Sequence, residues 1–225
     1  MKIAVLTGAG ISAESGLKTF RDSNGLWEGH DVMQVASPQG FENDPQLVLD
    51  FYNARRRQLL EVQPNAAHEA LVTLEKEHEV TIITQNVDDL HERAGSSKVL
   101  HLHGELLKVR STFKSDLILD WKNDLNVGDF CEFNHQMRPH IVWFGEEVPL
   151  MEDAMKIVED ADIVIIIGTS MQVYPAAGLV QYTSYDASIY FVDPNPSITS
   201  SERITVISEN ATTGVPKVIS EIKRL

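Results

Sequence analysis

The stretch that decides the fold is KIAVLTGAGISAESG, at residues 2–16. Its first five residues have the apolar composition of a strand buried on both faces, and they lead directly into a turn that contains Gly8 and Gly10. Together with Ala13, these glycines match the G-x-G-x-x-G/A pattern of dinucleotide-binding turns between a strand and a helix. A tight turn without a ligand would use the same residue types, so this stretch alone predicts the turn and leaves its ligand open.

Short apolar runs continue the same organisation along the chain. Runs rich in Val and Ile occur at 80–83, 99–102, 163–167, 189–192 and 204–207. Helical spacing of apolar residues occurs between and around them, at 45–62, 65–78, 151–160, 175–182 and 216–225. Pro216 is expected in the first turn of the last helix. Strands that alternate with helices predict an α/β fold with a Rossmann-like, doubly wound parallel sheet.

Two segments interrupt this alternation. Residues 23–62 show helical spacing with no strand, and residues 105–139 are irregular in pattern. We expect both to be insertions that pack together as a small domain, and residues 1–22, 63–104 and 140–225 to form the Rossmann-like domain. A cleft would then lie between the domains, where ligands usually bind.

Composition limits the classes of partner. The chain has 225 residues, is 43% hydrophobic and carries a formal charge of −14, which disfavours nucleic acid and anionic lipid as partners. Cys131 is the single cysteine, so no intramolecular disulfide is possible. The apolar run at 163–167 is too short to cross a bilayer, and the N-terminus lacks the length of a signal peptide. We therefore expect a soluble, cytoplasmic protein without a membrane partner.

The residues after the glycine turn argue against a dehydrogenase. Such an enzyme needs a second strand about twenty residues on, which ends in an acidic residue for the ribose hydroxyls. Here residues 17–31 read LKTFRDSNGLWEGHD, which has no strand pattern. Arg21 in this segment could contact phosphate, guard a ribose or remain on the surface.

Small polar residues follow two of the expected strands, in TQNVDD (84–89) and IGTS (167–170). The carboxyl ends of parallel strands are where an open α/β sheet binds its ligands. Asn86 can both donate and accept hydrogen bonds toward hydroxyl groups, and Asp88 can accept from an amide. A turn cap is the alternative role for these residue types.

The sequence HLHG at 101–104 raises the question of a metal site. Two histidines at this spacing on a strand could chelate an ion, but a zinc site needs further ligands and none is evident nearby. A histidine with a pKa near neutrality suits proton removal from a ribose hydroxyl, and Gly104 leaves room beside the ring. We predict that His103 is a general base, with a buried structural histidine or a metal ligand as its alternative roles, that His101 is structural and that no metal is bound.

Several long motifs occur together in this chain. They are GAGISAESGLKTFR (8–21), GLW (25–27), TQNVDDLHERAG (84–95), HLHGEL (101–106), VWFGE (142–146) and GTSMQVYPAAG (168–178), followed by Ala211. In content and order they resemble the sirtuin family of NAD-dependent protein deacylases. The segments FYNARRRQL (51–59) and QPNAAHEAL (63–71) resemble its bacterial branch that prefers acidic acyl groups.

The resemblance implies that NAD is a co-substrate and that acylated lysines of proteins or peptides are the partners. NAD-binding positions carried over from the family are Gly8, Ala9, Gly10, Ile11, Ala13, Phe20, Arg21, Trp27, Gln85, Asn86, Asp88, Gly168, Thr169, Ser170, Asp193, Asn195 and Ala211. Substrate-binding positions are Tyr52, Arg55, Val142, Trp143, Phe144, Gly145, Val173 and Tyr174, with 142–145 pairing as a strand with the substrate backbone.

The reaction that the resemblance implies begins when the acyl-lysine carbonyl oxygen displaces nicotinamide from the ribose. His103 then helps a ribose hydroxyl to attack the acyl carbon. The products are free lysine, nicotinamide and O-acyl-ADP-ribose. Tyr52 and Arg55 would bind the carboxylate of a succinyl or malonyl group, since residues three apart on a helix share one face.

This chain departs from the family at two places. Many sirtuins hold a structural zinc with two cysteine pairs, but Ser111 and Lys114 stand where the first pair is expected and the second retains only Cys131. We therefore predict a zinc-ribbon remnant without zinc, packed instead by Phe113, Leu117, Ile118, Leu119, Trp121, Phe130 and Phe133. Asp193 replaces the usual asparagine, and its carboxylate would favour NAD over NADP.

Two other functions would use the same pocket. One is a non-catalytic NAD sensor or partner-binding module, and the other is mono-ADP-ribosyl transfer. The presence of Asn86, Asp88 and His103 together argues against a pure sensor. Detection of O-acyl-ADP-ribose would separate the deacylase from both.

Overall fold

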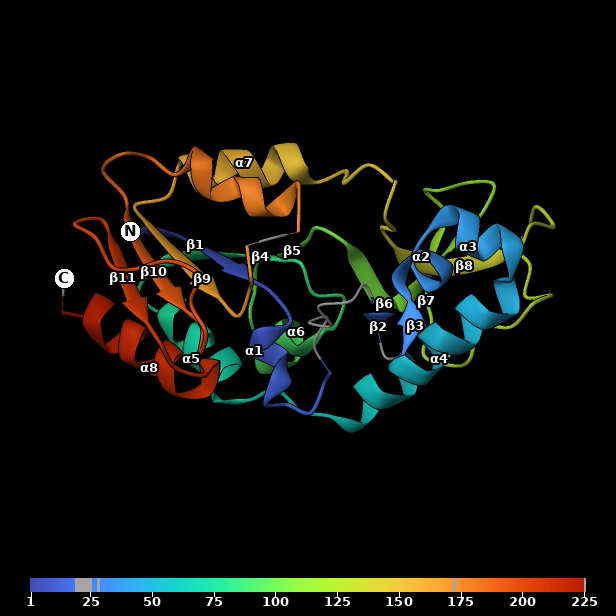
Figure 1. Cartoon of the computed structure of the whole chain (residues 1–225), viewed down its shortest axis with the longest axis horizontal. Coiled ribbons are helices and arrows are strands. Elements are labelled where there is room, and N and C mark those ends of the chain that lie inside the picture. Colours follow the sequence, from blue (N-terminus) through green and yellow to red (C-terminus); the bar gives the residue numbers. More distant parts are fainter. Residues whose placement is uncertain (19–25, 28, 172, 225) are drawn as a thin grey trace.

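The computed structural model describes residues 1–18, 26–27, 29–171 and 173–224 (Figure 1). Its centre is a six-stranded sheet, ordered β11-β10-β9-β1-β4-β5, in which all neighbouring strands are parallel. The strands are β1 (Lys2–Thr7), β4 (Glu79–Thr84), β5 (Val99–His101), β9 (Ile163–Ile167), β10 (Ser188–Val192) and β11 (Ile204–Ile207). The predicted Rossmann-like parallel sheet is confirmed.

The order of the strands determines where a ligand can bind. From the central β1 the chain adds β4 and β5 on one side, and later adds β9, β10 and β11 on the other. The order therefore reverses between β1 and β9, and open α/β sheets bind ligands outside the carboxyl ends of the strands at such a point. The turn at Gly8 follows β1 and the turn at Gly168 follows β9, so both meet there.

Helices cover both faces of this sheet, as Figure 1 shows. α5 (Ala66–Leu74) and α8 (Ala211–Ile222) pack on one face around a core that includes Val5, Ile82 and Ile165. α7 (Met151–Glu159) and the 3₁₀ helix η1 (Ala176–Tyr182) cover the other face. Two short helices, α1 (Gly10–Ala13) and α6 (Leu90–Ala94), follow β1 and β4.

The start of α8 differs from the sequence expectation. The helix begins at Ala211, so Pro216 lies inside it and not in its first turn. A carboxylate from a distant part of the chain stabilises this start, because Glu14 accepts hydrogen bonds from the Thr212 backbone N–H (3.1 Å) and hydroxyl (2.8 Å). Glu14 and Thr212 are far apart in the sequence, so the residues around Pro216 could not show that the helix begins at Ala211.

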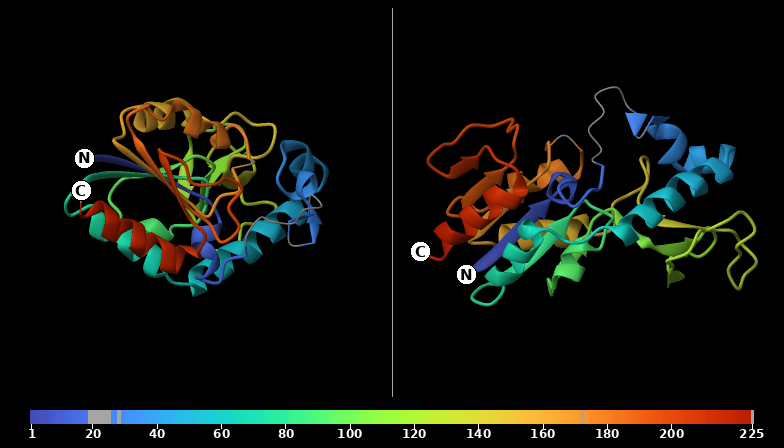
Figure 2. Two further views of the ribbon diagram at one scale, coloured as in Figure 1. Left: turned by 60° about the vertical axis from the view of Figure 1, so that its left-hand side comes forward. Right: turned by 90° about the horizontal axis from the view of Figure 1, so that it is seen from below.

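The remaining elements gather at one end of the molecule, away from the six-stranded sheet (Figures 1 and 2). They comprise the hairpin β2 (Leu26–Trp27) and β3 (His30–Asp31), the helices α2 (Val32–Val35), α3 (Pro38–Asn43) and α4 (Pro45–Glu61), and a second sheet. This sheet is antiparallel, in the order β7-β6-β8, and consists of β6 (Gly104–Ser111), β7 (Ile118–Asp120) and β8 (Met137–Ile141).

The expectation that residues 105–139 are irregular was therefore wrong. β6 alternates in burial along much of its length, with Leu106 and Val109 buried on the inner side. Charged residues such as Lys108 and Arg110 occupy the more accessible positions, and their mixture with apolar residues hid the strand pattern. β7 is exposed throughout, so it carries no alternation at all.

The positions expected for zinc ligands hold a hydrogen-bonded pair. Ser111 Oγ lies 3.3 Å from Cys131 Sγ, and it also accepts the backbone N–H groups of Phe113 (3.1 Å) and Lys114 (3.2 Å). Across the described ranges, no three His, Cys, Asp or Glu side chains come together as a metal site. A structural zinc ion takes four such ligands, so these residues do not fit it.

The packing near this pair also differs from the expectation. Phe113 is 64% exposed, and Ile118, Leu119, Phe130 and Phe133 are exposed as well. The buried cluster instead consists of Leu49, Val109, Leu125, Cys131 and Met137, and of the seven expected residues Leu117 and Trp121 pack against it. Leu49 belongs to α4, so a helix from the other insertion supplies part of the apolar packing that was expected from residues 113–133 alone.

We expect the purified protein to hold much less than one zinc ion per chain and to melt at the same temperature with and without a chelator. Structural zinc contributes about 10–16 kcal/mol in zinc-finger peptides, so a domain that depended on it would lose its fold on chelation. Elemental analysis and thermal melts with EDTA measure both quantities. Stoichiometric, tightly held zinc would contradict this expectation and direct attention to Cys131, His135 and His140.

Candidate active site

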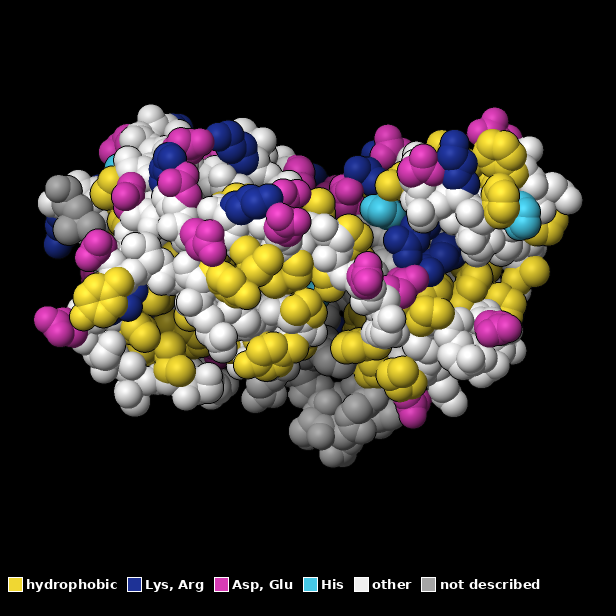
Figure 3. All heavy atoms as spheres, turned by 90° about the horizontal axis from the view of Figure 1, so that it is seen from above, with side chains coloured by type: hydrophobic (Ala, Val, Ile, Leu, Met, Phe, Trp, Pro, Cys, Tyr) yellow, Lys and Arg dark blue, Asp and Glu magenta, His cyan; other side chains and the backbone are white. Residues whose placement is uncertain are grey.

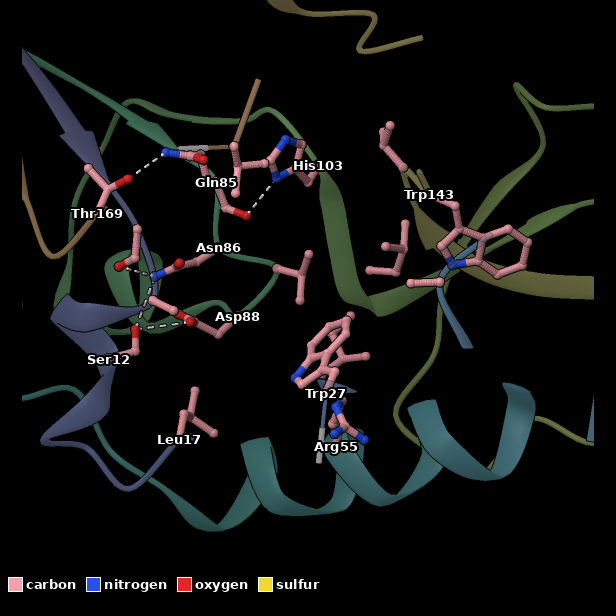
Figure 4. Close-up of a pocket in the computed structure, with 18 of the residues that line it drawn as sticks. Ser12, Leu17, Trp27, Arg55, Gln85, Asn86, Asp88, His103, Trp143 and Thr169 are labelled. Atoms are coloured by element: carbon pink, nitrogen blue, oxygen red, sulfur yellow. Dashed lines mark hydrogen bonds between the residues drawn. The ribbon is translucent and has the colours of Figure 1, made fainter. Parts of the chain in front are cut away.

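A cavity of about 300 Å³ lies at the carboxyl edge of the six-stranded sheet. One wall is formed by the turns after β1, β4 and β9, and the other by α4 and the segment that follows β8. Figure 3 shows the surface indented between the two groups of elements, and Figure 4 shows the residues that line the cavity. The cavity therefore occupies the predicted position, at the switch point of the sheet.

The glycines of the first turn pack against the turn after β9. A Cβ atom on Gly10 would lie 2.5 Å from the Gly168 Cα atom, and Gly168 itself has a positive φ of 60°. The backbone N–H of Gly8 donates to Ile167 and that of Gly10 donates to Gly168. The two glycines therefore allow the turns after β1 and β9 to pack closely together, and the expected contact of this turn with a pyrophosphate stays a prediction.

Asn86 and Asp88 are held to this turn by a hydrogen-bonded network (Figure 4). The Asn86 side-chain amide donates to the Gly8 carbonyl (3.1 Å) and to Ser12 Oγ (3.2 Å). Ser12 Oγ in turn donates to Asp88 Oδ2 at 3.0 Å. Gln85, the residue before Asn86, donates to Thr169 Oγ1 at 3.3 Å. The polar residues that follow β1, β4 and β9 therefore form one surface of the cavity.

Burial makes the Asp88 carboxyl group a weaker acid than an exposed aspartate. Removal of the carboxylate from water raises its pKa to about 6, although hydrogen bonds from the Leu90 backbone N–H and from Ser12 oppose the shift. Above that pH the protein therefore carries a buried negative charge at the cavity wall. A group raised in this way destabilises the fold once it is ionised, because the folded state holds the proton more tightly than the unfolded chain.

We expect Asp88→Asn to raise thermal stability while it weakens the recognition of NAD. A pKa raised by about two units corresponds to about 3 kcal/mol at pH values above 6, which is roughly 6–12 °C in melting temperature for a protein of this size. Asparagine can still accept the Leu90 N–H, and the Ser12 hydroxyl can turn to accept its amide. Melts at pH 8 and pH 5 test this, since the gain should be full at pH 8 and reduced to about half at pH 5, which lies between the unfolded and folded pKa values of Asp88. An equal effect at both pH values would show that ionisation of Asp88 is not the cause.

The ring of His103 is oriented by one backbone carbonyl. Its Nδ1 atom lies 3.1 Å from the Gln85 carbonyl oxygen, which can only accept a hydrogen bond. Nδ1 must therefore carry the hydrogen, and Nε2 keeps its lone pair in the neutral ring. Burial lowers the pKa of His103 below its ordinary value, and the Gln85 carbonyl only partly opposes this. His103 is therefore a neutral ring at the cavity with an available basic nitrogen.

Three aromatic or basic side chains lie at the other end of the cavity. Tyr52 is fully buried, and its hydroxyl accepts a hydrogen bond from Trp143 Nε1 at 3.0 Å. Indole N–H is a donor only, so the hydroxyl hydrogen of Tyr52 remains able to donate. Arg55 stacks on the Phe51 ring at 3.3 Å and donates to the Phe51 carbonyl. Tyr52 and Arg55 both line the cavity, as their spacing on α4 predicts.

Two charged residues, Arg138 and Glu146, hold Trp143 in position. Arg138 lies 3.3 Å from the Trp143 ring centroid and pairs with Glu146 at 2.6 Å. Glu146 also accepts the backbone N–H of Trp143 at 2.8 Å. The Val142 and Phe144 backbone N–H groups donate to His103 and Ala36. The segment 142–145 forms no strand in the structure, and its expected pairing with the substrate backbone stays a prediction.

Some predicted site residues lie away from this cavity. Ile11 is fully buried in the core, whereas Ala13 is exposed. Asp193 and Asn195 follow β10, and Ala211 begins α8, and none of them lines the cavity. Phe20 and Arg21 lie outside the described residues. The other predicted positions line the cavity: Gly8, Ala9, Gly10, Trp27, Tyr52, Arg55, Gln85, Asn86, Asp88, His103, Val142, Trp143, Phe144, Gly145, Gly168, Thr169, Ser170, Val173 and Tyr174.

Ser12 and Glu146 were missed by the sequence analysis. Ser12 bridges Asn86 and Asp88, and Glu146 holds both Trp143 and Arg138. Both lie inside motifs that drew attention for other residues, but nothing in their local spacing shows a partner that is distant along the chain.

In the part of the chain that the structure describes, no helix is both long enough and apolar enough to span a bilayer.

Comparison with known proteins agrees with this geometry. The model of the Sir2 family matches residues 8–175. A protein of Helicobacter pylori (strain J99) named NAD-dependent protein deacylase is 60% identical over 210 residues, covering 93% of this chain and 90% of the relative. A protein of the same name from Bacteroides thetaiotaomicron is 53% identical over 230 residues, covering 99% and 97%.

Solved structures of the same family superpose on nearly the whole chain. A Sir2 homologue in complex with NAD gives a TM-score of 0.88 at 36% identity, covering 99% of this chain and 89% of the homologue. A Sir2 protein bound to an acetylated peptide gives 0.81 at 28% identity, covering 98% and 93%. With a family match over most of its length and relatives of such high identity, this chain belongs to the Sir2 family.

Proposed function

We propose that this protein is an NAD-dependent deacylase, which removes acyl groups from protein lysines and forms nicotinamide and O-acyl-ADP-ribose. The observation that carries the proposal is the state of His103, a neutral ring whose Nδ1–H is bound to the Gln85 carbonyl and whose Nε2 is available. It shares one cavity with the polar residues after β1, β4 and β9. The NAD-dependent deacylase relatives support this assignment.

NAD would bind along the carboxyl edge of the six-stranded sheet. The cavity-lining residues Gly8, Ala9 and Gly10 and residues 168–170 would contact its pyrophosphate and adenosine side, and Asn86 and Asp88 its nicotinamide side. Asp193, Asn195 and Ala211 would extend this site beyond the cavity toward the adenosine. In this proposal residues 1–22, 63–104 and 140–225 form the NAD-binding domain, and residues 23–62 and 105–139 form the small domain.

The residues of the chain would act in a defined order. The cavity walls bring the acyl-lysine carbonyl oxygen to the ribose C1′ atom, where it forms a bond as nicotinamide leaves with the glycosidic electron pair. His103 Nε2 then accepts the proton of a ribose hydroxyl as that oxygen bonds to the acyl carbon. Lysine leaves as the free amine and one water molecule is consumed. Enclosure of the site limits hydrolysis by water at the earlier step.

The acyl end of the site would accept acyl groups with a terminal carboxylate. The Arg55 guanidinium and the Tyr52 hydroxyl line the same end of the cavity, and both can donate to a carboxylate. Acetyl groups would fit as well, since they demand no partner there. We therefore propose succinyl- and malonyl-lysine as substrates beside acetyl-lysine.

The test is incubation of the purified protein with NAD and lysine peptides that carry acetyl or succinyl groups, followed by mass spectrometry. Loss of the acyl group only when NAD is present supports the proposal. NAD binding without turnover would indicate a sensor. Transfer of ADP-ribose to protein without loss of the acyl group would indicate the ADP-ribosyltransferase.

A further inference from the structure

His101 and His103 hold two successive carbonyls of the loop after β4. His103 Nδ1 bonds to the Gln85 carbonyl and His101 Nδ1 bonds to the Asn86 carbonyl, each at 3.1 Å. We infer that His101 is an imidazolium that fixes the Asn86 backbone and places a positive charge near Asp88, and that it is thereby a positioning residue for the reaction. This inference rests on the proposed function, in which Asn86 and Asp88 hold NAD.

The partners of His101 determine its protonation. Nδ1 faces a carbonyl oxygen, and Nε2 lies 2.7 Å from the Glu92 carboxylate. Both partners only accept hydrogen bonds, so both ring nitrogens must carry hydrogen for both bonds to exist. The side chain is 8% exposed, which leaves little room for water to replace either partner. A ring with two N–H groups is an imidazolium.

His103 shares with His101 the contact between Nδ1 and a backbone carbonyl, but within the described ranges it lacks a contact like that of His101 with Glu92. Its Nδ1 is bound to a carbonyl, but among the described residues no carboxylate bonds to its ring, and burial lowers its pKa. Glu92 on α6 is therefore what separates the two rings. One histidine is kept neutral and can act as a base, while the other is kept charged only two residues away.

The titratable groups around His101, taken together, favour the same state. They come from the loop after β4, α6 and β6, and they are Asp88, His91, Glu92, Glu105 and Lys108. Burial alone would lower the pKa of His101, but the Glu92 bond and charge, the Glu105 charge and the Asn86 carbonyl raise it overall. Burial would raise the pKa of Glu92, and the bond to His101 lowers it. Lys108 pairs with Glu105 at 2.8 Å, and burial keeps His91 neutral.

Fixing the Asn86 carbonyl completes the anchoring of this residue. Its N–H donates to Thr84 Oγ1 at 3.0 Å, and its side chain donates to the glycine turn and Ser12. When His101 loses a proton, one of its two bonds loses its hydrogen. The stability from this pair is fully present below about pH 6.5 and is lost as the pH rises through the raised pKa. Activity should therefore decline on the alkaline side as His101 deprotonates.

The first test is the protonation state itself, read by long-range ¹H–¹⁵N NMR of the wild-type protein at pH 7. We expect both ring nitrogens of His101 to be protonated and the ring of His103 to be neutral with hydrogen on Nδ1. A neutral His101 at pH 7 would overturn the inference. This measurement needs no turnover, so its failure is distinguishable from a failure of the proposed function.

The second test is Glu92→Gln, which removes the charge but can keep the contact. A glutamine amide can donate to the unprotonated Nε2 of a neutral ring while Nδ1–H still bonds to Asn86. We expect kcat/KM for NAD to fall about fivefold to tenfold at pH 7 because a charge-assisted bond is replaced by a neutral one. The alkaline decline should disappear, and KM for the acyl peptide should remain unchanged.

Glu79→Gln is the matched control, because it removes a carboxylate that pairs with Lys98 on the surface at the start of β4. It should leave the pH profile and the NAD kinetics unchanged. A folded Glu92→Gln protein, verified by its circular dichroism spectrum, that retains the wild-type alkaline decline would overturn the positioning role. A lower melting temperature with an unshifted profile would show that the pair serves only the fold.

Discussion

Replacement of His103 by alanine is expected to lower kcat for acyl transfer by about 10²–10⁴ and to leave NAD binding largely intact. The ring lies at the cavity wall and its Nε2 is the basic atom, because Nδ1–H is bound to the Gln85 carbonyl. Its lowered pKa keeps it unprotonated at neutral pH, so the base is available without a preceding deprotonation. Steady-state kinetics and NAD titration by calorimetry measure the two effects separately.

His103→Gln is the sharper variant, since its amide can still donate to the Gln85 carbonyl but cannot act as a base. It should lose activity as fully as His103→Ala while retaining the local structure. His135→Ala serves as the control, because His135 is exposed and stacks on Phe113 in the small antiparallel sheet region. Near-normal turnover in a folded His103→Gln protein would remove His103 from the proposed mechanism.

The acidic side of the pH profile should reflect two groups. The pKa of His103 lies below its ordinary value, so protonation removes the base only at acidic pH. Asp88, with a pKa of about 6, loses its charge in the same range. We therefore expect activity to fall below about pH 6, and Asp88→Asn should leave the contribution of His103 as the remaining acidic transition.

Replacement of Arg55 by methionine is expected to lower kcat/KM for a succinyl-lysine peptide by about 10- to 150-fold. A hydrogen bond to a charged group contributes roughly 1.5–3 kcal/mol, and each 1.4 kcal/mol is about tenfold. Acetyl-lysine has no carboxylate to lose, so its kcat/KM should change much less. The Arg55 guanidinium lies over the rings of Phe51 and Trp27, and methionine fills part of that space with an uncharged apolar side chain.

The ratio of kcat/KM for succinyl-lysine to kcat/KM for acetyl-lysine distinguishes a loss of acyl-group recognition from a loss of folded structure. Arg57→Met is the matched control, because Arg57 lies on the same helix but is exposed and pairs with Asp124 at 2.6 Å. Its variant should treat both substrates as the wild type does. Equal losses on succinyl- and acetyl-lysine in Arg55→Met would show that Arg55 supports the fold or the NAD site and does not recognise the acyl group.

The arginines of α4 illustrate what the sequence could not show. Arg55, Arg56 and Arg57 stand together in the sequence and could have formed one solvated basic turn. In the structure Arg56 is fully buried and donates to the Leu106 carbonyl and to Asn53, and burial lowers its pKa to about 10. Three successive residues on a helix point in three directions, but only tertiary contacts decide which direction is buried.

The parallel sheet was predictable because its strands are buried on both faces. Runs such as 163–167 are apolar throughout, which few other structures require, and the strand-end positions of Asn86 and Asp88 follow from the direction of the chain. The small sheet was not predictable, since β7 is exposed along its whole length. The same holds for its core, to which Leu49 of α4 contributes.

Of the two histidines, His103 had a role that could be predicted from the sequence, whereas the role of His101 could not be predicted. The spacing HLHG identified a pair and gave a reason to choose His103 as the base. The role of His101 depends on Glu92, which precedes it by nine residues on α6 and meets it only in the folded protein. Hydrogen bonds between residues that are distant along the chain determine the protonation of His101, and the spacing of neighbouring residues cannot predict them.

The measurement that tests the central claim most directly is the product balance in one reaction of enzyme, NAD and acetyl-lysine peptide. We predict that deacylated peptide, nicotinamide and O-acetyl-ADP-ribose form in equal amounts, because each acyl group leaves on one ADP-ribose. Deacylated peptide with free acetate and unconsumed NAD would contradict the claim. So would nicotinamide release with ADP-ribose as the only other product and an unchanged peptide.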